Sequence, residues 1–325
     1  MTNAIKIDGT GGPEVNQWVD VEVGAPGPGM ARMRHTAIGV NFIDIYYRKG
    51  VYPPPNGFPL INGQEGAGVV TAVGDGVTGL TPGDRVVYQG PLGAYAEERL
   101  IAADKLVKLP EDLDDAIAAA VFLKGLTVQT LLRRVFKVER GHTILFYAAA
   151  GAVGTLGCQW AHALGATVIG LVGSDDKIPV AKDNHCDHVI NFRKDDFVAR
   201  VKEITKGEGV DVVYDSIGKD TFPATLDCLK PMGMWVDFGY APGMPATGYA
   251  PLAALSRRRI SDDEINAIAS DFTMHRRAPI TTADVMVAIT RTTDGLPSLD
   301  DMQRVERRLD AIGCTRSAHC WRSDN

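Results

Sequence analysis

The sequence has few cysteines and no long apolar run. Its five cysteines are scattered and form no C-x-x-C pair: Cys158, Cys186, Cys228, Cys314 and Cys320. Scattered cysteines favour reduced, structural thiols over a disulfide framework. The longest apolar stretches are far shorter than the roughly 20 residues that span a bilayer. The N-terminal residues have no basic start followed by an apolar run. We therefore expect a soluble, cytoplasmic protein with no signal peptide and no membrane partner.

Charge of one sign is not concentrated along the chain. The formal net charge is −6 and there is no lysine-rich block, which argues against nucleic acid as the main partner. Hydrophobic residues make up 45% and charged residues 23% of the sequence, the composition of a globular protein. A length of 325 residues is enough for two domains, each with its own core.

The pattern of short segments changes near residue 125. Residues 1–124 contain β-type segments separated by glycine and proline, such as "ARMRHTAIGV", "EGAGVVTAVG" and "DRVVYQG", which favours a compact, β-rich, barrel-like domain. Over 125–256, apolar segments alternate with helical ones: "HTILFYAAAGAVG", "TVIGLVGS", "HVINF", "DVVYDSIG" and "MWVDFGYA". This alternation predicts an α/β domain with a parallel, doubly wound sheet.

Residues 257–325 differ in composition from the rest of the chain. Lysine occurs 13 times up to residue 255 and never afterwards, whereas 11 of the 21 arginines lie in residues 256–325. "SRRRISDDEINAIASD" could begin a helix, and a helical apolar stripe follows at Met302, Val305, Leu309 and Ile312. One interpretation is a solvated helical tail. The other is a change of reading frame near residues 255–258, because a GC-rich gene read out of frame tends to yield arginine in place of lysine.

The segment "AAAGAVG", residues 148–154, has the form of a dinucleotide-binding turn. It follows an apolar strand and opens a helix, with the spacing A-x-G-x-x-G. Gly151 would let the backbone approach a pyrophosphate, and Gly154 would let the helix pack closely on the strand. Exposed N–H groups and the helix dipole would then stabilise the phosphate charge. The cofactor-binding candidates in this turn are Ala149, Gly151, Ala152, Val153 and Gly154.

The end of the second strand favours NADPH over NADH. An acidic residue about 20 positions after the glycines would bind the ribose 2′-hydroxyl and repel a 2′-phosphate, but Ser174 stands there. Gly173 leaves room, Ser174 can donate to a phosphate oxygen, and Lys177 supplies positive charge. Asp175 or Asp176 could instead reach the ribose, so the alternative cofactor stays open.

These segments, together with "GVNFIDIYYRKG", "PLINGQEGAGVV", "PGDRV" and "LKGLTVQ", are similar to those of the medium-chain dehydrogenases/reductases. Over about residues 4–250 the chain most closely resembles the zinc-independent branch, the NADPH:quinone oxidoreductases of the zeta-crystallin type. The resemblance implies a GroES-like catalytic domain over 1–124 and a Rossmann domain over 125–256. The zinc-dependent relatives carry a cysteine and a histidine where this chain has Asn41 and Gln64. Zinc prefers thiolate, imidazole and carboxylate ligands, so no zinc site is expected.

The resemblance also implies roles for individual residues. Asn41 would lie beside the nicotinamide and the substrate, and Gln64 would occupy the vacant metal region. Tyr46 and Tyr52 would stack on a flat quinone and donate a hydrogen bond, although Tyr52, next to "PPP", could equally be a loop anchor. Phe192 departs from the aromatic hydroxyl that is usual after the third strand, which removes one hydrogen bond to the 2′-phosphate. The further cofactor contacts implied are Lys124, Thr127, Phe192, Ser216, Phe238 and Gly239. Independently of the resemblance, Arg193, after the third strand, is a second cationic candidate for the 2′-phosphate beside Lys177.

Without a Lewis acid, the substrate must already be a good hydride acceptor, so the sequence predicts an NADPH-dependent quinone reductase that works without a metal. Two alternatives stay open: reduction of an α,β-unsaturated carbonyl, and a non-catalytic nucleotide-binding protein that is crystallin-like or RNA-associated. The resemblance implies a homodimer joined by a strand past residue 256. "SRRRISDDEIN" replaces that strand here, which puts the dimer in question.

Overall fold

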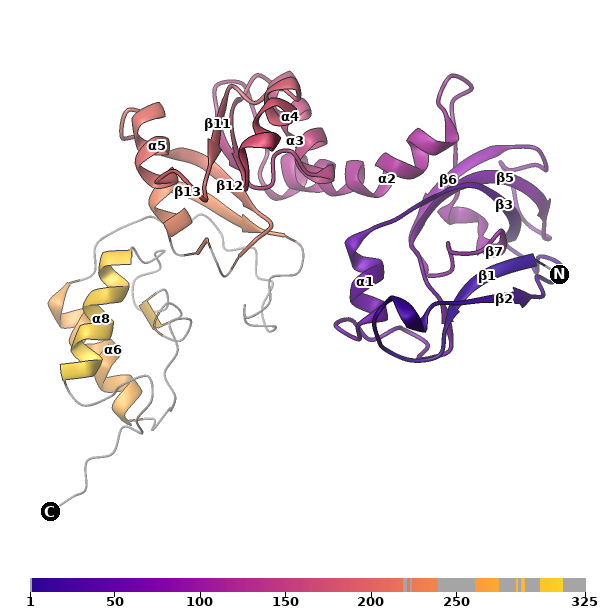
Figure 1. Ribbon diagram of the computed structural model, residues 1–325, viewed down its shortest axis with the longest axis horizontal. Helices are drawn as coiled ribbons and strands as arrows, with labels where there is room; N and C mark the ends of the chain where they lie inside the picture. Colours follow the sequence, from indigo (N-terminus) through magenta and orange to yellow (C-terminus); the bar gives the residue numbers. More distant parts are fainter. Residues whose placement is uncertain are drawn as a thin grey trace, which may run out of the picture. The chain divides into compact units, whose positions relative to one another are not determined.

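Two units make up the chain, Met1–Thr127 and Val128–Asn325 (Figure 1). The computed structural model describes residues 2–218, 221–222, 224–238, 261–274, 285, 288–289 and 299–311. The division between the units falls within helix α2 (Asp115–Gln129). One helix therefore contributes residues to both units.

The first unit is built from two antiparallel sheets. One has the strand order β7-β3-β5-β6-β8 and the other has the order β2-β1-β4. The strands are β1 (Thr2–Ile7), β2 (Gln17–Val21), β3 (Met30–Gly39), β4 (Leu60–Ile61), β5 (Glu65–Val73), β6 (Arg85–Gln89), β7 (Glu98–Ala102) and β8 (Val107–Lys108). The three segments that the sequence marks as strands are β3, β5 and β6, so this prediction is confirmed.

Strand β3 changes register where it approaches the candidate site. Its pairing with β5 shifts between His35 and Ala37, which leaves one residue of β3 unpaired in a bulge. After the bulge, Gly39 lies opposite Glu65, the first residue of β5. This bulge offsets an opposite shift between Arg32 and Met33, so the two shifts together set which residues meet where β3 ends.

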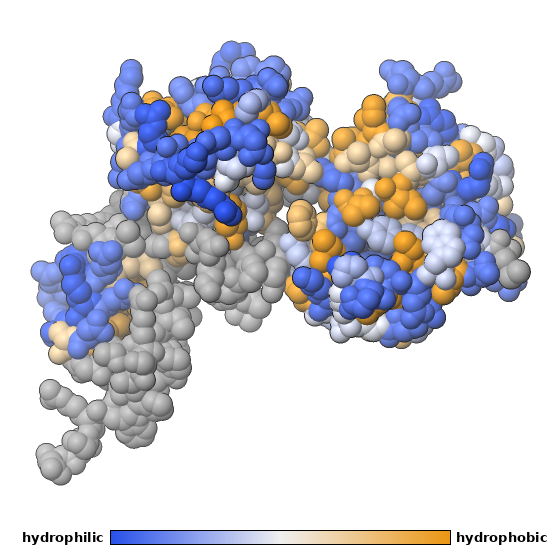
Figure 2. Space-filling model, in the orientation of Figure 1, coloured by the Kyte–Doolittle hydropathy of each residue, from blue (hydrophilic) through white to orange (hydrophobic). Residues whose placement is uncertain are grey.

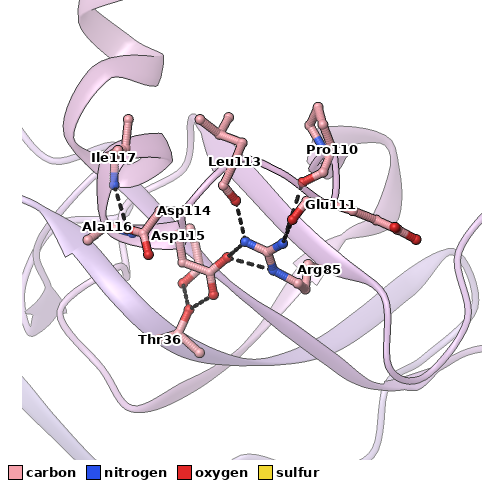
Figure 3. A network of polar contacts seen from close by, with 10 residues as sticks. Thr36, Arg85, Pro110, Glu111, Leu113, Asp114, Asp115, Ala116 and Ile117 are labelled. Carbon is pink, nitrogen blue, oxygen red and sulfur yellow. Dashed lines mark hydrogen bonds and ion pairs between the residues drawn. The ribbon is translucent and has the colours of Figure 1, made fainter.

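A polar network fixes the start of α2 (Figure 3). Asp114 Oδ1 accepts two backbone N–H groups of the first turn, at 2.8 and 3.2 Å, as an N-cap residue does. Arg85 Nε donates to Asp115 at 2.9 Å, and the same guanidinium donates to the Leu113 carbonyl. The Thr36 hydroxyl donates to Asp115 as well. Strands β3 and β6 therefore hold the helix that carries Lys124.

Helix α2 continues as a π-helical turn, η3 (Thr130–Val135). By length and composition alone, Asp115–Val135 could cross a membrane, a test that core helices of soluble proteins also pass. Val128, Leu131 and Leu132 are buried in the core of the second unit. That burial favours a core helix over this part of the segment.

Five parallel strands form the sheet of the second unit, in the order β11-β10-β9-β12-β13. They are β9 (Thr143–Phe146), β10 (Thr167–Val172), β11 (His188–Asn191), β12 (Val210–Asp215) and β13 (Leu229–Asp237). All five strands predicted from the sequence are present, and the doubly wound α/β fold is confirmed. The strand order reverses between β9 and β12, and open α/β sheets bind ligands beside such a reversal.

Helices cover both faces of this sheet (Figure 1). Helix α3, helix α4 and η3 pack on a core that includes Ile144 and Phe146, whereas α5 and η5 pack around Leu145 on the other face. Neighbouring residues of β9 thus belong to two cores on opposite faces, which explains why Ile144, Leu145 and Phe146 are all apolar. The helical elements are α3 (Ala152–Ala163), η4 (Asp175–Lys177), α4 (Ile178–Asp183), α5 (Phe197–Ile204) and η5 (Ala224–Cys228).

Two helices are described in the tail, α6 (Asp262–Met274) and α8 (Leu299–Ala311). At the start of α6, Ser261 and Glu264 form a capping box: the Ser261 N–H donates to Glu264 at 2.9 Å, and the Glu264 N–H donates to the Ser261 hydroxyl at 3.3 Å. The two helices share an apolar cluster, in which the expected stripe residues Met302, Val305 and Leu309 are buried. The fourth stripe residue, Ile312, lies outside the described residues, as do 239–260. The reading-frame hypothesis stays a prediction.

Candidate active site

Glu65 is the centre of a buried polar cluster in the first unit. Its side chain is fully buried, and its carboxylate accepts three hydrogen bonds. Lys124 Nζ and Asn41 Nδ2 donate to Oε2 at 2.7 and 2.8 Å. The backbone N–H of Leu123 donates to Oε1 at 2.6 Å. The cluster therefore joins the segment that follows β3, the start of β5 and the C-terminal part of α2.

This cluster fixes the direction of the Asn41 amide. A carboxylate accepts hydrogen bonds, so Asn41 must present its NH₂ group to Glu65 and direct Oδ1 elsewhere. The carboxylate fits because Gly39 has no side chain: a Cβ there would lie 2.4 Å from Glu65 Oε2 and 2.3 Å from the Ala119 carbonyl oxygen. Two residues proposed from the sequence, Asn41 and Lys124, are thus brought together by a glutamate that was not among the predicted site residues.

Asp44 holds the backbone of Asn41. Helix α1 (Phe42–Arg48) begins after Asn41, and Asp44 Oδ2 accepts from the Asn41 N–H and from the Tyr95 hydroxyl, both at 2.9 Å. Asp44 is 2% exposed, and burial raises the pKa of its carboxyl group. Its other oxygen, Oδ1, is buried without a hydrogen-bond partner in the described part of the chain.

The other three predicted catalytic residues lie in a neighbouring aromatic group. The rings of Tyr46 and Tyr52 meet edge to face with their centroids 5.6 Å apart, and the rings of Tyr47 and Tyr52 are 6.0 Å apart. Gln64 Nε2 lies 3.4 Å from the Tyr47 hydroxyl, a long hydrogen bond. Tyr47, which was not predicted, therefore connects Gln64 to the tyrosine pair. The backbone N–H of Tyr52 also donates to the Tyr46 carbonyl at 3.3 Å, so Tyr52 anchors its loop as well.

Thr127 has no hydrogen bond to the Glu65 cluster among the contacts of the described residues. Its hydroxyl donates to the Leu123 carbonyl at 3.0 Å, one turn earlier in α2. Such a bond satisfies the hydroxyl within its own helix. A cofactor contact by Thr127 stays a prediction.

The nucleotide-type turn lies between β9 and α3. Ala148 has a positive φ of 49°, and the Gly151 N–H donates to the Ala148 carbonyl at 2.7 Å. A Cβ on Gly154 would lie 2.2 Å from the Ala148 carbonyl oxygen and 2.7 Å from Ala149 Cα, so only glycine allows α3 to start this close to the turn. Gly151 is the N-cap of α3, whose first N–H groups have no partner within the helix. A dinucleotide phosphate suits such a turn.

Candidate residues for the 2′-phosphate surround the end of β10. Ser174 is the N-cap of η4, and its side chain makes no capping hydrogen bond. Lys177 is exposed. A Cβ on Gly173 would have Arg193 Nε as its nearest neighbour at 3.5 Å, followed by the Phe192 ring at 3.8 Å. The structure therefore brings Arg193 and Phe192, from the end of β11, to the same corner of the sheet.

Asp175 is engaged with residues at the end of β11. Its carboxylate accepts from Asn191 Nδ2 at 2.6 Å and forms an ion pair with Lys194. The hydrogen bonds from Lys194 and Asn191 lower the pKa of Asp175. The carboxylate of Asp175 is therefore directed toward β11. Of the two acids that could bind the ribose of NADH, Asp176 is the one that stays open.

Two acids lie at the ends of β12 and β13. Asp215 accepts from the N–H groups of Ile217 and Gly218, at 2.8 and 3.0 Å, and from the Thr221 hydroxyl at 3.0 Å. Burial and the charge of Asp215 raise the pKa of Asp237 to about 6. Neither acid was predicted from the sequence. Their place is the edge of the sheet where ligands bind in this fold class.

The remaining predicted contacts follow these strands. Ser216 is half-buried in the turn that Asp215 closes. The Phe238 ring contacts Phe146 of β9 edge to face, with centroids 6.0 Å apart. Gly239 lies outside the described residues.

His35, the histidine of the first strand-rich region, is a packed strand residue. Its Nδ1 lies 2.6 Å from the Ala96 carbonyl oxygen and its Nε2 lies 2.8 Å from the Tyr88 hydroxyl. Burial lowers the pKa of His35 to about 4. Within the residues that the structure describes, no group of three or more His, Cys, Asp and Glu side chains is placed to hold a metal ion.

An apolar hollow of about 430 Å³ also lies on the first unit. Its wall includes Ile5, Trp18, Ile38, Val40 and Tyr95, and none of Asn41, Glu65 and Lys124 lines it. Trp18 and Val40 are 67% and 73% exposed. Figure 2 shows apolar surface on the visible face of this unit. The hollow is thus separate from the Glu65 cluster.

The comparison with known proteins assigns the two units to a family. Residues 27–111 match the alcohol dehydrogenase GroES-like domain, and residues 152–278 match the zinc-binding dehydrogenases. The quinone oxidoreductase of Pseudomonas aeruginosa is 50% identical over 249 residues, which are 76% of each chain. The chain belongs to the medium-chain quinone oxidoreductases.

Two further proteins are similar to this chain. The 2-haloacrylate reductase of a Burkholderia species is 49% identical over 249 residues, 75% of each chain. The crystal structure of Escherichia coli quinone oxidoreductase complexed with NADPH is 38% identical, has a TM-score of 0.73 and is matched over 98% of both chains. The family and fold class predicted from the sequence are confirmed.

Several residues of the candidate site were not among the site residues predicted from the sequence, although some of them had a signal there. A glutamate inside the apolar run "NGQEGAGVV" is the pattern of a buried acid, and Glu65 is that residue. Asp44 stands three residues after Asn41, the spacing of a helix capping pair. Tyr47 and Tyr95 had no such signal, because their contacts depend on how the loops fold.

Proposed function

We propose that this protein reduces quinones with NADPH and without a metal. The 50% identity with the Pseudomonas aeruginosa quinone oxidoreductase carries the proposal. The metal-free part is supported by Asn41 and Gln64, an amide pair in place of the cysteine and histidine that a zinc site would use.

The residues of the second unit fit a dinucleotide. The position that only glycine can fill, Gly154, is present at the start of α3. The turn over 149–154 would hold the pyrophosphate, and Ser174, Lys177 and Arg193 would hold the 2′-phosphate. We propose Lys124, Thr127, Ser216, Phe238 and Gly239 as further cofactor contacts. Bound NADPH supplies the hydride.

The first unit would bind and orient the substrate. Glu65 fixes the Asn41 amide through the bond at 2.8 Å, and Asp44 fixes the Asn41 backbone at 2.9 Å. Tyr46 and Tyr52 offer aromatic surface for a flat quinone ring. Held side chains do not have to reorganise when the substrate binds, which is how positioning lowers a barrier.

NADPH oxidation with benzoquinone in the presence of a strong chelator tests this function. Turnover should persist, and complete loss on chelation would overturn the metal-free part. A non-catalytic nucleotide-binding protein, crystallin-like or RNA-associated, would show NADPH binding by fluorescence quenching but no turnover.

A second candidate activity is reduction of an activated carbon–carbon double bond. The 49% identity with a 2-haloacrylate reductase favours it. Both reactions deliver a hydride to a conjugated acceptor. Side-by-side turnover of benzoquinone and an enone decides between them, by comparing kcat/KM for the two substrates. The homodimer and the cytoplasmic location stay predictions, and light scattering of the purified protein tests the first.

A further inference from the structure

Quinone reduction needs a proton as well as a hydride, and the buried cluster offers few groups that could supply it. Glu65 accepts three hydrogen bonds through its two oxygens and is fully buried. Tyr95 donates its hydroxyl proton to Asp44 at 2.9 Å. Asp44 is 2% exposed and accepts from two donors at one oxygen. None of these three side chains is placed to give a proton to a bound ring.

Lys124, in contrast to these three side chains, has N–H donors that the contact with Glu65 does not use. It uses one N–H for the contact with Glu65 at 2.7 Å, and an ammonium group has three donors. About a tenth of its side chain is exposed, whereas Glu65 is at 0%. Both Lys124 and Asn41 are held on the same oxygen of Glu65, so the ammonium has a fixed place beside the proposed substrate residue.

We propose that Lys124, held by Glu65, stabilises the substrate oxygen that becomes negative on hydride transfer and donates a proton to it. This inference rests on the proposed quinone reduction, and it goes beyond a cofactor contact for Lys124. A preorganised cation in a site of low polarity stabilises a developing oxyanion without reorganising when the charge appears.

The balance of the step is simple. A quinone that gains a hydride becomes a hydroquinone monoanion, which is a phenolate. One N–H bond of the Lys124 ammonium breaks, one O–H bond forms, and neutral hydroquinone leaves. The Lys124 amine then takes a proton from water. Alkylammonium ions and phenols are acids of similar strength, so neither direction of this transfer is strongly uphill.

The first experiment measures binding and involves no turnover. p-Nitrophenol, an analogue of the hydroquinone product, is titrated by absorbance while bound to the protein saturated with NADP⁺. The wild type should bind the phenolate form, and the pH midpoint of the bound phenol should fall relative to free solution. Lys124→Met should abolish that fall. The control is Lys105→Met, which removes an exposed lysine paired with Asp104, and it should behave like the wild type.

The second experiment separates chemistry from folding. Lys124→Met leaves the buried Glu65 carboxylate without its cation, so the variant could be unfolded. The double variant Lys124→Met/Glu65→Gln removes both charges and retains a hydrogen-bonding side chain at residue 65. If Lys124 acts on the substrate, the folded double variant should lose about 100- to 1,000-fold in kcat. The loss should be smallest for quinones whose hydroquinones are the strongest acids. It should persist at saturating NADPH and exceed the weakening of the Kd of NADPH that loss of a cofactor contact at Lys124 causes.

The outcomes distinguish the two proposals. If the wild type does not turn over quinones at all, the proposed function fails. If it does, and the double variant matches its kcat and its nitrophenol titration, Lys124 merely neutralises Glu65 and the inference is overturned. A loss that is uniform across the quinone series and disappears at saturating NADPH would also overturn it, because a cofactor contact alone behaves in that way.

Discussion

Gly154→Ala should disturb both the stability of the second unit and its nucleotide binding. The added Cβ would lie 2.2 Å from the Ala148 carbonyl oxygen, 2.7 Å from Ala149 Cα and 2.9 Å from the Ala148 carbonyl carbon. All three neighbours are backbone atoms, which cannot rotate away as a side chain can. Ordinary contacts of a Cβ begin at 3.4 Å, so either the turn or the start of α3 must move by about 1 Å.

Overpacking of this kind typically costs about 1–3 kcal/mol. For a unit of this size, each kcal/mol lowers the melting temperature by roughly 2–4 °C, so we expect a fall of about 2–12 °C. The displaced backbone is also the proposed pyrophosphate cradle, and we expect NADPH binding to weaken at least about tenfold, the equivalent of 1.4 kcal/mol. Thermal unfolding followed by circular dichroism and a fluorescence titration with NADPH measure the two effects.

Two matched variants test whether the effect of Gly154→Ala comes from the close backbone contacts of the added Cβ. A Cβ on Gly151 would lie 3.1 Å from the Ala148 carbonyl oxygen, so Gly151→Ala should have a smaller effect. Gly125 stands inside α2, and apart from the helix's own backbone no described atom lies within 4 Å of its Cβ position, so alanine there should raise stability by about 0.5–1 kcal/mol. If Gly154→Ala melts and binds NADPH like the wild type, α3 does not depend on this close approach and the reasoning is wrong.

Three further predictions address acid stability, cofactor choice and the tail. Because the folded protein keeps His35 neutral down to about pH 4 while the unfolded chain takes up a proton below 6.5, the free energy of unfolding should fall by up to about 3 kcal/mol as the pH drops from 6.5 to 4. His35→Gln should flatten that decline in urea unfolding. The double variant Ser174→Ala/Lys177→Ala should weaken NADPH binding about 10- to 150-fold more than NADH binding, and equal weakening would place 2′-phosphate recognition elsewhere. Sequencing the coding DNA should find an insertion or deletion near codon 256 whose correction restores an apolar, strand-rich ending. Without one, the reading-frame hypothesis is wrong.

The strands could be predicted from the sequence because each strand has a pattern that is local in the chain. The last three residues of β9, Ile144–Phe146, are all apolar, and the structure shows why: Ile144 and Leu145 belong to cores on opposite faces of the sheet. The steric requirement at Gly154 is also local, since its neighbours Ala148 and Ala149 lie within six residues. Such features follow from period and spacing alone.

The candidate site depends on contacts that no local pattern contains. Lys124 meets Glu65 across 59 positions of sequence, and Asn41 meets it across 24. Two compensating shifts in the β3–β5 pairing leave Gly39 opposite Glu65, and a net shift of one residue would turn the strand's side chains to the other face. The same holds for Asp175, whose partners Asn191 and Lys194 come from the end of a neighbouring strand. Sequence reasoning therefore found the residue types but not their partners.

The placement of α2 bears on any attempt to dissect this protein into separately expressed halves. The first turn of the helix is tied to the first unit through Arg85 and Asp115, and Lys124 binds Glu65 there. Four residues after Lys124, Val128 is already buried in the core of the second unit. A fragment that stops at residue 127 ends in mid-helix, and a fragment that begins at residue 128 starts there, so each would lose backbone hydrogen bonds of the helix. Because the division falls within a helix and not in a loop, we expect limited proteolysis to spare this junction.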